Sequence, residues 1–475
     1  MTLTRRLILC ILLISMTLSL VACAGGVTPE PAETVDSVIT SDIPIPDPTP
    51  VQLGYTGTMT DYEYRYDSGE SREWEEDILF LAQRCLDHHP KLTEKCWLYG
   101  NETGYTLEYY DPELREEFIR EINDLILAVP ELEESELIFE ISRIVNILGD
   151  GHTRFYITGK GSYFPLDFEI FYESGEAELY AVAVPENMPE LLFSKLAAIN
   201  GVSVDEVIDR LLPYTYGDND YWKVYIITEQ GEFIVKKDML DLIGVTDKDS
   251  DSADFTLETE DGSVTVTLTT ELGREMLDKS FKAVGALTKK NSRLNYWHEF
   301  LEDDNIEYIR YNRCRESGDF SYSDFWLEIM LDIRACGTPP KVVFDLRGNG
   351  GGIFPPTGVG GFIASLKSVE ISGLYVLIDH GVFSSASAIT AELKQEFDCA
   401  VTVGMPTGQS ANLFGPANFY KFPNHDYYNF DMSDRQYVWW KGYDEYTILP
   451  DITVCQTLDD YKQGIDTVLE TVKGY

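Results

Sequence analysis

Basic residues are few in this chain, which has 37 lysines and arginines against 81 aspartates and glutamates and a net charge of −44. A surface of that sign repels nucleic acid and anionic lipid headgroups. We therefore expect no nucleic-acid partner. The acidity could favour cationic peptides, or it could simply reflect the environment in which the protein works.

The N-terminal apolar run is too short for a comfortable transmembrane helix, which needs about 20 residues. This run, Leu7–Leu20, follows Arg5 and Arg6 and has the shape of a secretory signal sequence. It ends in L-V-A-C, with Cys23 last, which resembles the bacterial lipobox. The resemblance implies removal of residues 1–22 and acylation of Cys23, and hence an extracytoplasmic protein anchored by lipid to the bacterial cell membrane. The alternative is an ordinary secretory signal with a chance cysteine.

Several cofactor motifs are absent. The sequence contains no G-x-x-x-x-G-K-[ST] and no G-x-G-x-x-G segment, which argues against a nucleotide-phosphate site. No C-x-x-C pair occurs either, so no zinc or redox motif is present. We expect no metal and no cofactor. Cys85 and Cys96 could form a disulfide in an oxidising compartment, and the sequence leaves this open.

The chain divides into five segments by composition and periodicity. After the signal peptide, residues 23–65 are rich in proline, threonine and aspartate and indicate a disordered tether. Residues 66–158 show helical spacing of apolar residues and predict a helical N-terminal domain. Residues 159–278 favour short strands and predict a β-rich insert. Residues 279–475 alternate strands with helices, which is typical of an α/β core.

Two segments of the predicted core carry candidate chemistry. Asp345-Leu-Arg-Gly-Asn-Gly-Gly-Gly352 follows a buried strand, and its glycines let backbone N–H groups approach an anion. Ser385 is expected at the start of a helix, where the dipole and free N–H groups favour negative charge. These are the needs of a nucleophile beside an oxyanion hole. Ser384 and Ser387 are neighbouring candidates, and a simple helix cap is the other interpretation.

The order of the motifs resembles the S41 family of tail-specific or C-terminal-processing serine peptidases. The matching segments are D-L-R-G-N-G-G-G (345–352), S-S-A-S-A-I (384–389), V-G-M-P-T-G (403–408), L-P-D-I-T-V (449–454) and G-D-G-H-T (149–153). The resemblance implies a core with the ClpP/crotonase type of β-α spiral fold and hydrolysis of peptides or protein tails. It also implies Ser385 as nucleophile, with the N–H groups of Ala386 and Gly351 as oxyanion hole.

The general base departs from the common family pattern. Processing peptidases of this family use a lysine shortly after the P-T segment, and here Gln409 or Ser410 occupies that place. The chain therefore looks more like the tricorn-type branch, in which a histidine from the preceding domain assists the serine and a late carboxylate orients it. His152 matches the histidine, and Glu445 or Asp444 could be the carboxylate. A structural role for His152 at a helix end is the alternative.

Three further features bear on function. Residues 195–212 resemble the end of a PDZ module, which would bind a substrate C-terminus by strand addition. The missing lysine keeps open a catalytically degenerate surface lipoprotein that binds peptides or another ligand. His298, beside Trp297, is interpreted as a packing residue.

Replacing Cys23 by serine should release the protein from the membrane fraction and abolish fatty-acid incorporation, because the acyl chains need the thiol. Fractionation and labelling with a fatty-acid analogue measure both effects. Cys10→Ser, within the signal sequence, is the control and should remain anchored. Acyl label on the Cys23→Ser protein would contradict the lipobox interpretation.

Overall fold

The computed structural model describes residues 69–156, 161–173, 176–272, 281–282, 290–318, 320–353 and 359–475. The predicted signal peptide, the lipidation site Cys23 and the predicted tether before residue 66 lie outside these residues. Among the described helices, none combines the length and the apolar character that a bilayer crossing requires.

The N-terminal region is helical, as its periodicity predicts. It contains α3 (Gly69–His88), α4 (Pro112–Ala128) and α5 (Glu134–Asn146). Helix α4 begins with a proline in its first turn and is capped by Asp111, whose side chain accepts the Leu114 N–H. The apolar faces of the three helices share one buried core. Cys85 and Cys96 are both buried in this region and both are free, so the disulfide considered above is not formed.

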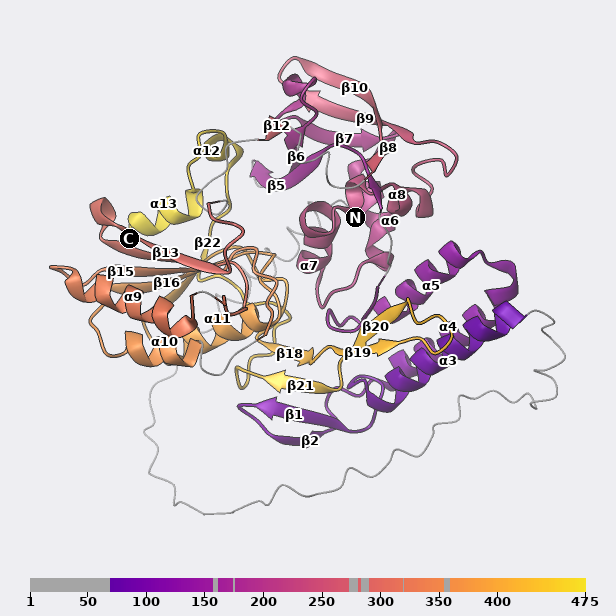
Figure 1. Cartoon of the computed structure of the whole chain (residues 1–475), viewed down its shortest axis with the longest axis horizontal. Coiled ribbons are helices and arrows are strands. Elements are labelled where there is room, and N and C mark those ends of the chain that lie inside the picture. Colours follow the sequence, from indigo (N-terminus) through magenta and orange to yellow (C-terminus); the bar gives the residue numbers. More distant parts are fainter. Residues whose placement is uncertain are drawn as a thin grey trace, which may run out of the picture.

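Strands from the C-terminal part of the chain also belong to this region. The sequence pattern does not predict this pairing. Strands β1 (Cys96–Gly100) and β2 (Gly104–Thr106) join β21 (Arg435–Val438) and β18 (Asn412–Gly415) in one sheet. Strand β3 (Arg154–Phe155) joins β20 (Asn429–Met432) and β19 (Asn418–Lys421) in another. In Figure 1 these yellow-orange strands lie against the indigo helices. Residues 412–438 therefore join the N-terminal region, through pairing with β1 and β3 and through packing of residues 420–432 on the helices, although they fall within the predicted core segment.

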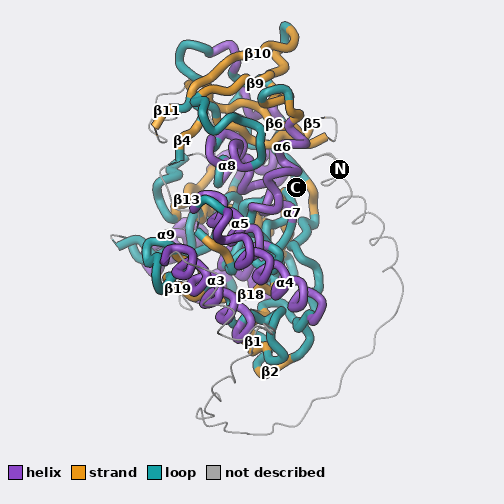
Figure 2. The backbone as a smooth tube through the Cα atoms, turned by 90° about the vertical axis from the view of Figure 1, so that its right-hand side faces the viewer, coloured by secondary structure: helices purple, strands orange, loops and turns teal. Residues whose placement is uncertain are grey.

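The middle region is built on a seven-stranded antiparallel sheet with β10-β9-β7-β6-β12 as its main path, while β5 pairs with β6 and β8 with β7. Its strands are β5 (Asp167–Glu173), β6 (Glu176–Val184), β7 (Lys195–Ile199), β8 (Val202–Ser203), β9 (Ser252–Thr259), β10 (Gly262–Thr269) and β12 (Phe281–Lys282). A two-stranded pair, β4 (Ser162–Tyr163) with β11 (Glu271–Leu272), adds to it. Three helices follow β8, namely α6 (Val204–Leu211), α7 (Asp220–Tyr225) and α8 (Lys237–Leu242). Both views place the sheet at the top, with α7 extending toward the rest of the molecule (Figures 1 and 2).

The C-terminal region is a three-layer α/β unit around a six-stranded sheet of order β13-β14-β15-β16-β17-β22. Every neighbouring pair is parallel except β13 with β14. The strands are β13 (Tyr296–Leu301), β14 (Ile306–Tyr311), β15 (Lys341–Asp345), β16 (Gly373–Ile378), β17 (Ala400–Gly404) and β22 (Ile452–Thr453). This arrangement confirms the α/β core expected from the alternation of strands and helices.

Helices cover both faces of that sheet. One face packs against α9 (Tyr322–Ala335), α10 (Val359–Leu366) and α11 (Ser385–Glu396). The other packs against α13 (Thr467–Lys473), which follows the short helix α12 (Leu458–Lys462). Residues alternate across the sheet, so that Val342 and Phe344 face the first layer and Val343 faces the second. The loops that leave the carboxyl ends of β15 and β16 carry both candidate chemical segments of the core.

Candidate active site

Ser384 has a strained backbone between strand β16 and helix α11. Its φ is +56° and its ψ −124°, a left-handed conformation that costs a non-glycine residue about 1–3 kcal/mol. Two contacts hold it there. The Ser384 N–H donates to Gln409 Oε1 at 2.7 Å, and the N–H of the preceding Phe383 donates to the Asn349 carbonyl at 3.1 Å. The turn sets the Ser384 side chain apart from those of the helix that follows.

Ser384, rather than Ser385, is the serine that meets His152. The distance from His152 Nε2 to Ser384 Oγ is 2.8 Å. The Ser385 hydroxyl instead donates to the Gly352 carbonyl at 2.7 Å. The expectation that His152 would contact Ser385 is corrected by one residue, because helix α11 begins at Ser385 and the left-handed residue just before it faces the histidine.

His152 is positioned by a buried carboxylate at the end of α5. Asp150 accepts the His152 N–H at 2.9 Å and the Thr153 hydroxyl at 2.6 Å, and it lies 3.2 Å from His89 Nε2. The imidazole packs on the Phe383 ring, with centroids 5.0 Å apart. The hydrogen bond to Asp150 thus restrains the His152 backbone, and the contact with Phe383 restrains its ring, where the N-terminal region meets the core.

The other imidazole nitrogen faces an amide. Gln409 Nε2 lies 3.4 Å from His152 Nδ1 and donates to Asp218 Oδ2 at 2.8 Å. Gln409 therefore contacts both members of the Ser384–His152 pair, in the place where the common family pattern has lysine. Asp218, just before α7, also accepts the Gly151 N–H at 3.1 Å.

The expected late carboxylate is not at the histidine. The side chains of Asp444 and Glu445 are exposed, and Glu445 contributes only its carbonyl, which accepts the Ser410 hydroxyl at 2.6 Å. Within the described part of the chain, no carboxylate makes a hydrogen bond to His152 Nδ1. Asp150 and Asp218 are instead the acids nearest the pair in the hydrogen-bond network, and neither belongs to a motif that sequence reasoning singled out for this role.

Burial sets the charges in this network. It lowers the pKa of His152, with Asp150 opposing the shift and Arg154 adding to it, so the imidazole is held neutral. It raises the pKa of Asp218 to about 7, and the charge of Asp150 contributes. Burial would also raise the pKa of Asp150, but the bond and charge of His89 hold that pKa below its usual range. Asp150 is therefore the permanently ionised acid, and Asp218 titrates near neutrality.

The two N–H groups expected to form an oxyanion hole are both used inside the loop. The Gly351 N–H donates to Asn349 Oδ1 at 2.9 Å, and the Ala386 N–H donates to the Phe383 carbonyl at 3.1 Å. For the N–H groups of Ser385 and Gly350, no acceptor occurs among the described residues. Gly351 has φ +89°, and a Cβ there would lie 2.6 Å from Ser384 Cβ, so a side chain at this position would displace the serine.

A cavity of about 340 Å³ opens beside Ser384. All three regions of the chain line it, and its wall consists of His152, Arg154, Tyr216, Trp222, Gln230, Gly350, Gly352, Phe383 and Ser384. Trp222 of α7 stacks on Phe383 with ring centroids 4.1 Å apart. The arrangement can present a carbonyl group to the serine hydroxyl next to an aromatic surface.

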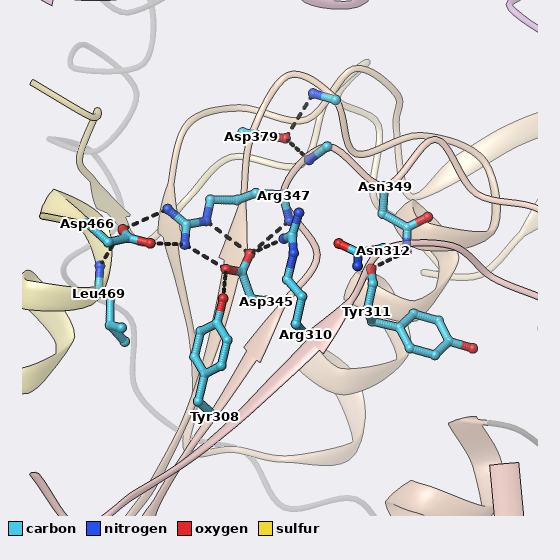
Figure 3. Close-up of polar contacts among 12 residues, drawn as sticks. Tyr308, Arg310, Tyr311, Asn312, Asp345, Arg347, Asn349, Asp379, Asp466 and Leu469 are labelled. Atoms are coloured by element: carbon cyan, nitrogen blue, oxygen red, sulfur yellow. Dashed lines mark hydrogen bonds and ion pairs between the residues drawn. The ribbon is translucent and has the colours of Figure 1, made fainter. Parts of the chain in front are cut away.

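A buried charge cluster supports the glycine-rich loop from below (Figure 3). Asp345 accepts from Tyr308 Oη at 2.6 Å, Arg310 Nη1 at 2.8 Å and Arg347 Nη2 at 2.6 Å. Arg347 also forms two hydrogen bonds with Asp466, at 2.9 and 2.7 Å. Two arginines thus balance two carboxylates in the interior, and the bonds join β14, β15 and the start of α13.

Comparison with solved structures shows the same fold in CPAF. Mature CPAF is 13% identical, with a TM-score of 0.57 over 86% of this chain and 97% of that one. CPAF complexed with lactacystin is 12% identical, with the same TM-score over 86% and 98%. The photosystem II D1 C-terminal processing protease matches with a TM-score of only 0.37 over 84% and 96%, too low to support an argument. At these identities the likeness shows the fold alone, and it confirms the α/β fold class that the S41 resemblance implies.

Comparisons of sequence are negative. No protein-family model matches the chain, and no curated protein matches it.

Asp466→Asn should destabilise the protein by about 3–5 kcal/mol, because it removes one charge from a buried, balanced cluster and leaves a net positive charge there. Asparagine can still cap α13, so the loss reports the charge. The control is Glu396→Gln, which breaks a half-exposed pair with Lys367 and should cost no more than about 1 kcal/mol. Urea unfolding followed by tryptophan fluorescence measures both. Equal losses in the two variants would contradict this account.

Proposed function

We propose that this chain is a serine peptidase in which Ser384 is the nucleophile and His152 the general base. The observation that carries the proposal is the 2.8 Å contact between His152 Nε2 and Ser384 Oγ, two residues 232 positions apart in the sequence. The serine precedes a helix in a strained turn, and the histidine is partly buried with a lowered pKa, which favours its neutral form. This is the arrangement that proton abstraction from a hydroxyl requires.

The reaction follows from the geometry. Ser384 Oγ attacks the carbonyl carbon of a peptide bond while its proton passes to His152 Nε2. The negative charge that develops on the carbonyl oxygen faces the N–H groups of Ser385 and Gly350, at the positive end of helix α11. The C–N bond then breaks, and His152 returns the proton to the leaving amine. In the second half of the cycle His152 takes a proton from a water molecule, which attacks the acyl carbon; the ester bond to Ser384 Oγ then breaks, and His152 returns the proton to that oxygen.

The imidazolium formed in these steps is stabilised through its surroundings rather than by a carboxylate on Nδ1. Asp150 carries a fixed negative charge and bonds the His152 backbone. Asp218, which accepts a hydrogen bond from Gln409 Nε2, adds a second negative charge when it ionises near pH 7; the Gln409 amide nitrogen itself cannot accept from the imidazolium. We infer a Ser–His dyad in which Gln409 positions Ser384 by accepting its N–H, and Asp218 acts on the imidazolium through its charge.

The substrate is proposed to be a peptide or protein segment outside the cytoplasm. The cavity is large enough for a side chain beside the scissile bond, and its aromatic wall suits an apolar group. The signal sequence and lipobox support an enzyme anchored through Cys23 on the outer face of a bacterial membrane. The rival is a surface lipoprotein that binds peptide without cleaving it. This rival is favoured by the observation that no carboxylate among the described residues forms a hydrogen bond with His152 Nδ1.

A fluorophosphonate probe should label the wild-type protein at one serine, and Ser384→Ala should lose both labelling and peptidase activity. The matched control is Ser385→Ala, which removes only the bond to the Gly352 carbonyl, worth about 0.5–1.5 kcal/mol of stability, and should remain labelled. Mass spectrometry of the labelled peptide and cleavage of a casein digest measure the outcome. Labelling of Ser385 would move the nucleophile. No labelling of the folded wild-type protein between pH 5 and 9 would favour the binding protein.

The rate should rise with pH along a limb below the ordinary histidine pKa of about 6.5, because burial lowers the pKa of His152 and only the neutral ring can accept a proton. His152→Ala should reduce kcat/KM at least about a thousandfold.

Asp218→Asn should lower kcat more above pH 7 than below it, because the carboxylate stabilises the imidazolium only when it is ionised. Lys394→Ala, which breaks an ion pair with Asp451, is the control and should keep the profile. An unchanged profile in His152→Ala would refute the histidine as base.

A further inference from the structure

A second polar cluster lies at the edge of the core sheet, outside the candidate active site. It joins His298 of the edge strand β13, Glu307 of β14 and Asp332 of α9. None of the three lines the cavity beside Ser384. No step proposed for the peptidase uses them.

The fold brings these residues together by simple periodicities. In the antiparallel pair His298 lies opposite Ile309 and Phe300 opposite Glu307, so His298 and Glu307 are diagonal neighbours on one face of the sheet. Asp332 and Glu328 are four residues apart on α9 and lie on the side of the helix that faces them. The result is one imidazole surrounded by three carboxylates from two elements.

The distances suit a shared ligand. His298 Nδ1 is 2.8 Å from Glu307 Oε1 and 3.6 Å from Asp332 Oδ2, and Nε2 is 3.5 Å from Glu328 Oε2. One ligand atom each from His298, Glu307 and Asp332 lies within 4.8 Å of the other two. Tetrahedral zinc with bonds of about 2.0–2.2 Å holds its ligand atoms about 3.3–3.6 Å apart. Small side-chain movements would therefore seat an ion.

The charge and hydrogen bonding of the cluster are unbalanced without a cation. The Glu307 side chain is fully buried, and its Oε2 has no hydrogen-bond partner. An unsatisfied buried oxygen of this kind is costly, particularly on a charged group. Among the described residues, no lysine or arginine forms an ion pair with Glu307, Glu328 or Asp332. Even a protonated His298 supplies a single positive charge for three carboxylates.

We propose that His298, Glu307 and Asp332 bind a divalent transition-metal cation, with zinc as the best match. One imidazole nitrogen with carboxylate oxygens suits zinc, whereas calcium and magnesium prefer oxygen ligands alone. Glu328 is within reach as a further ligand. The ion would connect the edge strand β13 to β14 and α9, and would thus stabilise the core independently of the peptidase reaction.

The test is titration of the chelator-treated full chain with zinc alone, by calorimetry and thermal denaturation. One ion should bind per chain and raise the Tm, and equal concentrations of calcium or magnesium should not. Glu307→Gln and His298→Gln should weaken zinc binding at least about tenfold. Asp332→Asn, at a half-exposed position, should fold normally and also lose the zinc-dependent rise in Tm.

His425→Gln is the matched control. His425 also bonds a buried carboxylate, Asp77, at 2.8 Å, but it does not belong to the three-ligand cluster. This variant should bind zinc like the wild type. Equal zinc affinity in the wild type and in folded Asp332→Asn, or no stoichiometric binding to the wild type, would overturn the proposal.

Discussion

The buried carboxylate of Asp345 is the interaction on which the geometry of the core depends. It ends β15, accepts hydrogen bonds from Tyr308, Arg310 and Arg347, and through Arg347 reaches the start of α13. Such a cluster is stable only when every charge is matched, because an unpaired ion in the interior costs several kcal/mol. The end of β15 is therefore held in place, and the path of the loop that follows Asp345 is fixed with it.

Residues of the loop after Asp345 also fix the position of Ser384. The Asn349 side chain donates to the Tyr311 carbonyl, and the Asn349 backbone carbonyl accepts the Phe383 N–H. Gly351 then packs against Ser384 more closely than any side chain would allow. The strained conformation of Ser384 is thus the last link of a chain of contacts that begins at a buried ion pair.

The position of His152 depends on a different feature, the pairing of strands that lie far apart in the sequence. Strand β3 begins two residues after His152 and pairs with β20, so that Arg154 lies opposite Asp431 and Phe155 opposite Phe430. The Thr153 hydroxyl also accepts the Ser433 N–H at 2.9 Å. Late strands of the chain therefore hold the start of the middle region against the N-terminal helices. In the proposed mechanism the base is this neutral histidine, which does not need the strongly depressed pKa that a buried lysine would need; Gln409 in the place of lysine is consistent with that proposal.

The local sequence pattern was sufficient to predict most helices and strands of the core. Strands β15 and β16 are built on the apolar residues Val342–Phe344 and Leu374–Ile378, and the helices before His152 show clear periodicity, so these elements follow from the composition of their own segments. His152 and the serine segment could also be singled out, because each follows a recognisable end of a strand or helix. Which of Ser384 and Ser385 contacts His152 was decided only by the tertiary structure, because that contact depends on the Ser384 backbone conformation, which hydrogen bonds from Gln409 and Asn349 hold in place.

The same holds for the acids and for His298. Glu445 was expected by its position near a motif, whereas Asp218 reaches the histidine through an amide 191 residues away. The sequence around His298 indicates only a packing residue. The carboxylates near it belong to a neighbouring strand and a helix. Periodicity and composition describe what each segment does with its nearest neighbours. Which polar groups meet in the interior is decided only when sheets and helices pack, because those contacts join residues whose separation in sequence carries no pattern.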